Sequence, residues 1–151
     1  MVAVSERVMA TYDAETLDQL GSVPAGTGPT HVAAAGRRAF VVDTTGDAVL
    51  ELDIGADPRL VSTTPAPGAP YGIAIDPRRN RLWVTLTARN EAVAYAITSS
   101  GLRPLERYPT VRQPNTIAVD ARSGDPLVAG RSAGGPLQRI RSRIPRATSG
   151  R

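Results

Sequence analysis

The chain has 151 residues, a formal net charge of +4 and no cysteine. Without cysteine it can form neither a disulfide framework nor a thiolate metal site, and no apolar run is long enough to span a membrane as a helix. All 18 positive residues are Arg, and six of them lie in the last 21 residues, so residues 1–130 carry a net charge of −2. This balance argues against a general basic surface for nucleic acid.

The first 27 residues predict three strands separated by polar turns. Short apolar runs favour strands at Val2–Val4, Val8–Tyr12 and Leu17–Val23. The opening residues lack the positive and long apolar regions of a signal peptide, and the sequence leaves the compartment open.

Residues 29–67 predict four strands in succession. The runs are His31–Ala35, Ala39–Val42, Ala48–Asp53 and Leu60–Thr64, and turn residues separate them. In the third run, a period of two places Glu51 on the opposite face from Leu50 and Leu52.

Residues 70–111 repeat this pattern. A first run opens at Pro70, and three more follow at Leu82–Thr85, Ala92–Ile97 and Leu105–Tyr108. Trp83, the single tryptophan, could stack against a ligand. Packing between adjacent sheets is the favoured interpretation, because Phe40 and Leu127 occupy matching places in the other repeats.

Residues 114–141 begin the pattern a third time and then lose it. Strands are expected at Thr116–Asp120, Asp125–Gly130 and, more weakly, Leu137–Arg141. Beyond this point Arg alternates with Ser, Ile and Pro, which predicts a disordered, Arg-rich tail at 142–151. A polyanion-binding arm is the alternative interpretation of the tail.

Three prolines mark the register of these repeats. Pro29, Pro70 and Pro114 lie 41 and 44 residues apart, and each is followed after three residues by Val or Ile and then by Ala. Four short strands per 40–45 residues are typical of a β-propeller blade. The sequence therefore predicts an all-β fold, a partial β-propeller of about three to four blades of four-stranded antiparallel sheets. A generic antiparallel sandwich is the alternative.

The predicted units are a partial blade at 1–27, blades at 28–68 and 69–112, a partial blade at 113–141 and the tail. A propeller typically needs four to eight blades to close, so we expect a fragment, an open arc or half of an assembly. An open arc would expose apolar blade faces at both ends, and self-association or poor solubility would follow.

The strand openings carry a resemblance to a known family. The Pro-x-x-Val/Ile-Ala pattern and the segments Phe40-Val41-Val42-Asp43 and Trp83-Val84-Thr85-Leu86 resemble the YVTN-type β-propeller repeat, and more loosely the lactonase-like seven-bladed propellers. Neither segment ends in the Asn of the Tyr-Val-Thr-Asn motif. The lactonase-like resemblance implies hydrolysis of a sugar lactone over the central channel, and it allows an extracytoplasmic location if the amino-terminal half is missing.

Candidate ligand-binding residues follow the three prolines, where loops enter the inner strands near the channel. They are Thr30, His31, Tyr71, Asn115 and Thr116. His31 is the only histidine, the residue type that most often serves as a general base, so a catalytic base is one interpretation. An ordinary hydrogen-bonded residue near the channel is the favoured interpretation.

Carboxylates recur near strand ends, at Asp43, Asp76, Asp120 and Asp125. Such groups could perform acid–base chemistry or bind Ca²⁺. Asp76 and Asp120 follow the inner strand at equivalent positions, where Asp commonly starts a turn. The sequence therefore predicts turn residues here, and it predicts neither a metal site nor a cofactor.

These observations favour a non-enzymatic propeller scaffold that presents loops for binding a protein or a small ligand. Two alternatives stay open: a lactonase-like hydrolase fragment, and a polyanion-binding protein that works through the Arg-rich tail.

Overall fold

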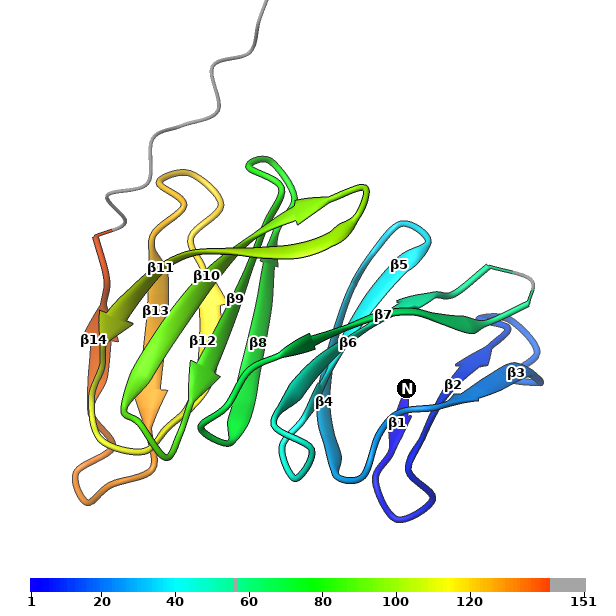
Figure 1. Ribbon diagram of the computed structural model, residues 1–151, viewed down its shortest axis with the longest axis horizontal. Helices are drawn as coiled ribbons and strands as arrows, with labels where there is room; N and C mark the ends of the chain where they lie inside the picture. Colours follow the sequence, from blue (N-terminus) through cyan, green and yellow to red (C-terminus); the bar gives the residue numbers. More distant parts are fainter. Residues whose placement is uncertain (56, 142–151) are drawn as a thin grey trace, which may run out of the picture.

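The computed structural model describes residues 1–55 and 57–141 and places them in four antiparallel sheets that stand side by side in an arc (Figure 1). The first sheet contains β1 (Val2–Ala3), β2 (Val8–Tyr12) and β3 (Gln19–Pro24). The second sheet contains β4 (Pro29–Ala35), β5 (Arg38–Asp43), β6 (Ala48–Asp53) and β7 (Arg59–Pro65). Within these two sheets, neighbouring strands are also consecutive in the chain.

The remaining strands form two further sheets of the same kind. The third contains β8 (Pro70–Asp76), β9 (Arg81–Leu86), β10 (Glu91–Thr98) and β11 (Gly101–Pro109), and the fourth contains β12 (Pro114–Val119), β13 (Pro126–Gly130) and β14 (Leu137–Arg139). The described residues include no helix that could cross a membrane.

The predicted fold class is confirmed: the protein is all-β and forms a partial β-propeller. Its two complete sheets have four strands each, and the sheets at the two ends have three in the described part of the chain. The exact unit boundaries stay a prediction, and the tail predicted at 142–151 lies outside the described residues.

The three repeats match in their strand pairing. Along each inner strand, the Ala that follows Val or Ile stands opposite a larger residue of the second strand. These pairs are Ala33 with Phe40, Ala74 with Trp83, and Ala118 with Leu127. Phe40, Trp83 and Leu127 therefore occupy equivalent positions, as the sequence predicts.

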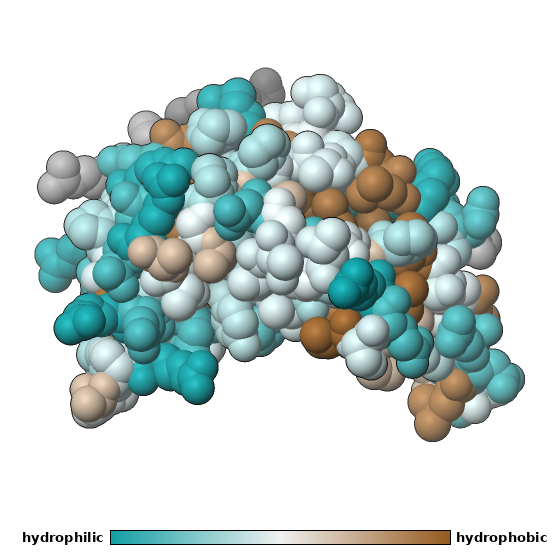
Figure 2. All heavy atoms as spheres, turned by 60° about the horizontal axis from the view of Figure 1, so that its bottom comes forward, coloured by the Kyte–Doolittle hydropathy of each residue, from teal (hydrophilic) through white to brown (hydrophobic). Residues whose placement is uncertain are grey.

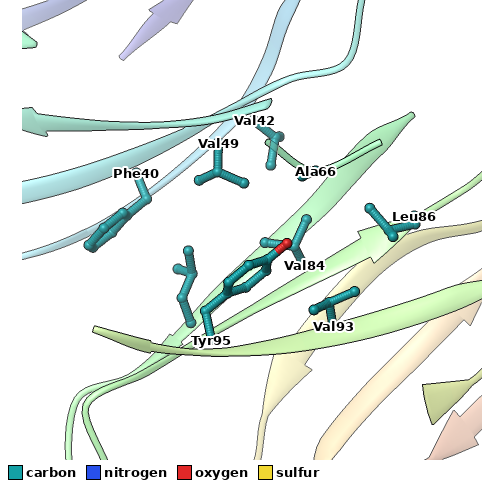
Figure 3. Close-up of a cluster of buried hydrophobic side chains, with 9 residues drawn as sticks. Phe40, Val42, Val49, Ala66, Val84, Leu86, Val93 and Tyr95 are labelled. Carbon is teal, nitrogen blue, oxygen red and sulfur yellow. The ribbon is translucent and has the colours of Figure 1, made fainter. Parts of the chain in front are cut away.

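The hydrophobic core is divided among the three spaces between adjacent sheets. The central cluster lies between the second and third sheets, and Figure 3 shows side chains of both sheets pointing toward one another there. Its members include Phe40, Val42 and Val49 from one side and Val84, Val93 and Tyr95 from the other. A thin sheet is therefore shielded from water chiefly by its neighbours, as in other stacked repeat architectures.

Two predictions about individual side chains are confirmed. Leu50 and Leu52 pack toward the first sheet, and Glu51 lies on the other face, where it pairs with Arg38 and accepts a hydrogen bond from Ser62. Trp83 is fully buried between the third and fourth sheets, with its ring centroid 5.6 Å from that of Tyr108.

Exposed apolar residues are unevenly distributed between the two ends of the arc. The end that holds the first sheet carries five large, exposed apolar residues, namely Met1, Val4, Tyr12, Leu17 and Leu20. On the described part of the fourth sheet, Leu137 is the large apolar residue that is exposed. Figure 2 shows the same asymmetry, with hydrophobic surface on the right of the view, toward the two amino-terminal sheets, and a hydrophilic left side. We therefore expect self-association, if it occurs, to involve the first sheet.

Candidate functional site

The inner strands share an irregularity at the position of the predicted ligand-binding residues. Just after the register proline, each inner strand contains one residue more than its partner strand. The shifts fall between Pro29 and His31, between Pro70 and Ile73, and between Pro114 and Thr116. A bulge of this kind leaves a residue unpaired and re-aims its side chain. Thr30, Tyr71 and Asn115 all lie in these bulges.

In the first two repeats, the threonine that directly follows the second strand of its sheet forms a hydrogen bond to the next repeat. The Thr44 hydroxyl donates to the carbonyl of Pro70 at 2.6 Å, and the Thr87 hydroxyl donates to the carbonyl of Pro114 at 2.7 Å. Thr44 Oγ1 also lies 2.8 Å from Thr30 Oγ1. Both threonines thus hold the bulge of the following inner strand in place.

Arg131 occupies the same position in the third repeat. Thr44, Thr87 and Arg131 each donate a backbone N–H to the residue that precedes the register proline of their own sheet, at 2.9, 3.1 and 2.9 Å respectively. No hydrogen bond or ion pair among residues 1–55 and 57–141 uses the guanidinium of Arg131. The third repeat therefore presents a free cation where the first two present an engaged hydroxyl.

A pocket of about 150 Å³ forms beside this cation. It is lined by Tyr71, Thr87, Gln113, Asn115 and Arg131. These residues come from the third and fourth sheets, at the loop end of the inner strands. The lining combines the Tyr71 ring, the Gln113 and Asn115 amides and the Arg131 guanidinium, which can donate several hydrogen bonds to a small ligand, whereas the Thr87 hydroxyl already donates to Pro114.

The structure brings some of the predicted ligand-binding residues together and separates others. Tyr71 and Asn115 share the pocket, and the His31 ring lies against the Tyr71 ring with centroids 4.7 Å apart. Thr30 is engaged by Thr44. Thr116 is exposed and contacts its neighbour Asn115 at 3.4 Å. Ligand binding by these five residues stays a prediction.

Three lining residues, Thr87, Gln113 and Arg131, were missed by the sequence analysis, which only counted Arg131 among the six arginines of the last 21 residues. The signal that could have identified two of them is the alignment of the three repeats with one another. When the sheets are aligned on their second strands, Arg131 falls on Thr44 and Thr87, and Gln113 falls on Ala69 directly before the register proline. Extending the alignment one residue beyond the strands would have identified both.

The recurrent carboxylates act within their own turns or local contacts. Asp120 accepts backbone N–H groups from Ser123 and Arg122, and the pKa of Asp120 lies below its usual value chiefly because of the Ser123 N–H. Asp76 is buried and pairs with Arg79 at 2.9 Å. The described residues contain no group of three or more His, Asp or Glu side chains that could hold a metal ion.

Asp43 supports the loop that leads into the first of the inner strands. Its carboxylate accepts backbone N–H groups of Thr27, Gly28 and Gly46 at 2.9, 2.7 and 2.9 Å. Burial raises the pKa of Asp43, but these three donors together outweigh burial and hold the pKa below its usual value. Asp43 is thus an ionised anchor for the loop.

No protein-family model and no curated protein matches the sequence. Similar solved structures include hydrazine synthase from Kuenenia stuttgartiensis, with a TM-score of 0.80 and 18% identity over 91% of this chain and 41% of that chain. A candidate 6-phosphogluconolactonase from Bacteroides fragilis has a TM-score of 0.64 and 17% identity over 79% of this chain and 40% of that one.

Virginiamycin B lyase from Staphylococcus aureus is also similar, with a TM-score of 0.62 and 14% identity over 95% of this chain and 52% of that chain. At these identities the likeness shows the propeller fold alone, because one propeller architecture hosts many unrelated activities. The chain spans about 40 to 50% of the length of the three structures.

Proposed function

We propose that the chain is a non-enzymatic β-propeller scaffold that binds a small carboxylate ligand in the pocket beside Arg131. The observation that carries the proposal is the replacement of a structural threonine by an arginine whose guanidinium has no partner among the described residues. Arginine presents a planar fork of donors that matches a carboxylate in two-point contact. Its flexible side chain is free to form that contact.

The rest of the lining suits a ligand with one anionic and one polar or flat part. The Tyr71 ring can cover one side of the ligand, and the amides of Gln113 and Asn115 can bond to its polar groups. Because pockets for drug-sized ligands usually span 300–1,000 Å³, a pocket of about 150 Å³ favours a ligand of a few carbon atoms. The assignment to YVTN-type repeats is part of this proposal and rests on the strand openings.

The alternatives receive less support. A lactonase-like activity would need a catalytic group poised over the channel, and His31 is instead an exposed ring against Tyr71, outside the pocket lining. Polyanion binding through the tail concerns residues 142–151, which lie outside the described residues.

The experiment is a titration of the ¹⁵N-labelled full chain with L-lactate, followed by NMR chemical shifts, with lactamide as the uncharged analogue. We expect L-lactate to shift the signals of Tyr71, Asn115 and Arg131 in a saturable way and lactamide to have little effect. Arg131→Thr should abolish the shifts. The matched control is Arg122→Thr, which removes an exposed arginine from the turn between β12 and β13.

Three results would refute the proposal. The first is the absence of saturable shifts with lactate and with a panel of acetate, pyruvate and citrate. The second is equal binding of lactate and lactamide, because the cation would then have no role. The third is an equal loss of binding in Arg131→Thr and Arg122→Thr, which would indicate attraction by overall charge.

A further inference from the structure

One residue of the pocket beside Arg131 stands at a position where the repeat keeps its backbone and changes its side chain. Ala69 and Gln113 each lie directly before a register proline, and both have a left-handed backbone, with φ angles of 55° and 52°. This conformation is uncommon for residues other than Gly, so the surrounding structure must hold it in place. The side chain at this position is Ala in the third sheet and Gln in the fourth.

The same pair of hydrogen bonds holds the backbone in both sheets. The Ala69 N–H donates to Asp47 Oδ1 at 2.8 Å, and the Ala69 carbonyl accepts the backbone N–H that follows the second strand at 3.1 Å. The Gln113 N–H donates to Asn90 Oδ1 at 2.7 Å, and the Gln113 carbonyl accepts the Arg131 N–H at 2.9 Å. Because the same arrangement forms around Ala69, the side chain of Gln113 is not needed for the local fold.

The side-chain amide of Gln113 is available for a ligand. No hydrogen bond among residues 1–55 and 57–141 uses this amide. The other amide in the pocket is partly engaged, because Asn115 accepts a hydrogen bond from the Thr116 hydroxyl at 3.4 Å. Gln113 and Arg131 are joined through their backbones, and both line the pocket. An uncommitted amide and an uncommitted guanidinium are therefore neighbours in a space of about 150 Å³.

We propose that the pocket recognises a small 2-hydroxycarboxylate and that Gln113 is the specificity-determining residue that binds its hydroxyl. This inference rests on the proposed function, in which Arg131 binds the carboxylate. A side-chain amide carries both an acceptor and donors, so it complements a hydroxyl, which also donates and accepts. A hydroxyl on the carbon next to the carboxylate would lie close to the carboxylate's partner, as Gln113 lies close to Arg131.

The charge of the lining separates hydroxy acids from amino acids. An ammonium group on the same carbon would lie beside the Arg131 cation, and no Asp or Glu is among the described residues that line the pocket. A like charge without a compensating carboxylate is unfavourable in a confined site. The ligand class is therefore 2-hydroxy acids of a few carbon atoms, in preference to amino acids and to carboxylates without a second polar group.

The test compares L-lactate with propionate, which lacks the hydroxyl, and with L-alanine, which carries an ammonium group in its place. Each compound is titrated into the ¹⁵N-labelled full chain, and its dissociation constant is obtained from the NMR chemical shifts. We expect lactate to bind about tenfold more tightly than either analogue, which corresponds to one additional hydrogen bond.

Two variants examine the role of the amide. Gln113→Ala introduces the residue of the preceding repeat and should remove the preference for lactate over propionate. Gln113→Met keeps most of the side-chain volume but lacks the amide, so it should have the same effect and separates hydrogen bonding from packing. The matched control is Gln19→Ala, which removes an exposed glutamine at the start of β3 and should keep the preference. Urea unfolding should show that both Gln113 variants are as stable as the wild type.

The outcomes distinguish this inference from the proposed function. If lactate and propionate bind equally and Arg131→Thr abolishes both, carboxylate binding stands and recognition of the hydroxyl by Gln113 is refuted. The inference is also refuted if Gln113→Ala and Gln113→Met keep the preference for lactate, or if L-alanine binds as tightly as lactate. If neither lactate nor propionate binds, the proposed function fails and this inference fails with it.

Discussion

The space between the second and third sheets is closed along its length, whereas the space between the first and second sheets is open at its inner end. In the closed space, Phe40 and Tyr95 fill the centre and the inner strand β4 lies beside β8. In the open space, smaller residues such as Ala25 and Ala39 contribute to the cluster, and an apolar cleft takes the place of an inner strand. The repeat residues are alike in both, so the neighbouring strand decides whether their side chains are covered or exposed.

The same contrast holds for the polar residues near the loop ends. Thr44 and Thr87 each donate to a following repeat, whereas Arg131 projects from the last repeat that the structure describes. Among the described residues, a position used for cohesion in two repeats is thus available for binding in the third. The proposed ligand site rests on this change of role.

Truncation of a residue in the closed space should have the largest effect on stability. Phe40 is 1% exposed, so Phe40→Ala should lower the free energy of unfolding by about 3–5 kcal/mol. Val32→Ala, in the open space, should change it by less than about 0.5 kcal/mol. Urea unfolding followed by circular dichroism measures both. Similar losses for the two variants would contradict the distinction between closed and open spaces.

Loss of the Asp43 carboxylate, which anchors the loop, should have the second-largest effect on stability. Asp43→Asn weakens the hydrogen bonds that three backbone N–H groups donate to this side chain. It should lower the free energy of unfolding by about 1–3 kcal/mol at neutral pH. Because the pKa of Asp43 is lower in the folded state than the usual 3.8, its stabilisation is present above about pH 3.8 and is lost as pH falls through the folded value. The stability difference between wild type and Asp43→Asn should therefore shrink in acid.

Unfolding curves at pH 7 and in steps from pH 4 downward test this behaviour. Asp13→Asn is a useful companion, because backbone N–H groups also lower the pKa of Asp13 in an exposed turn of the first sheet, so its stability difference should shrink in acid as well and be smaller at pH 7. A difference for Asp43→Asn that stays constant with pH would show that the carboxylate's charge has no role in anchoring the loop.

The fold could be predicted from sequence because each repeat encodes it independently. The spacing of Pro29, Pro70 and Pro114 and the apolar strand pattern depend on local geometry that recurs in every sheet. The strands near 29–111 and the burial of Trp83 followed directly. Single-residue features of the loops are harder to predict, because their partners lie in the next repeat.

The candidate site illustrates that limit. Tyr71 and Asn115 were identified because they directly follow the register prolines, and both line the pocket. Arg131 was counted only among the six carboxy-terminal arginines, although its place directly after the second strand and its backbone hydrogen bond both align it with Thr44 and Thr87. An exposed apolar face was expected at each end of an open arc, but its position beside Val32 depends on which strands neighbour β4 in the described residues and not on a motif within the cleft.

Loss of one inter-repeat tie should have a smaller effect than loss of the anchor. Thr87→Val removes the donor to the Pro114 carbonyl and should cost about 1 kcal/mol. Thr44→Val should cost slightly more, because Thr44 also contacts Thr30. Thr63→Val, on the exposed outer strand β7, is the control. If all three variants are equally stable, the threonines do not hold the repeats together.

Arg131→Thr should have the smallest effect on stability, although it restores the residue type of the two earlier repeats. The backbone bond from Arg131 to Gln113 is independent of the side chain, and the guanidinium has no partner among the described residues. The free energy of unfolding should therefore change by less than about 0.5 kcal/mol, while lactate binding is lost. A loss of 1 kcal/mol or more would mean that Arg131 contributes to cohesion as Thr87 does, and the contrast between inner and terminal repeats would no longer hold.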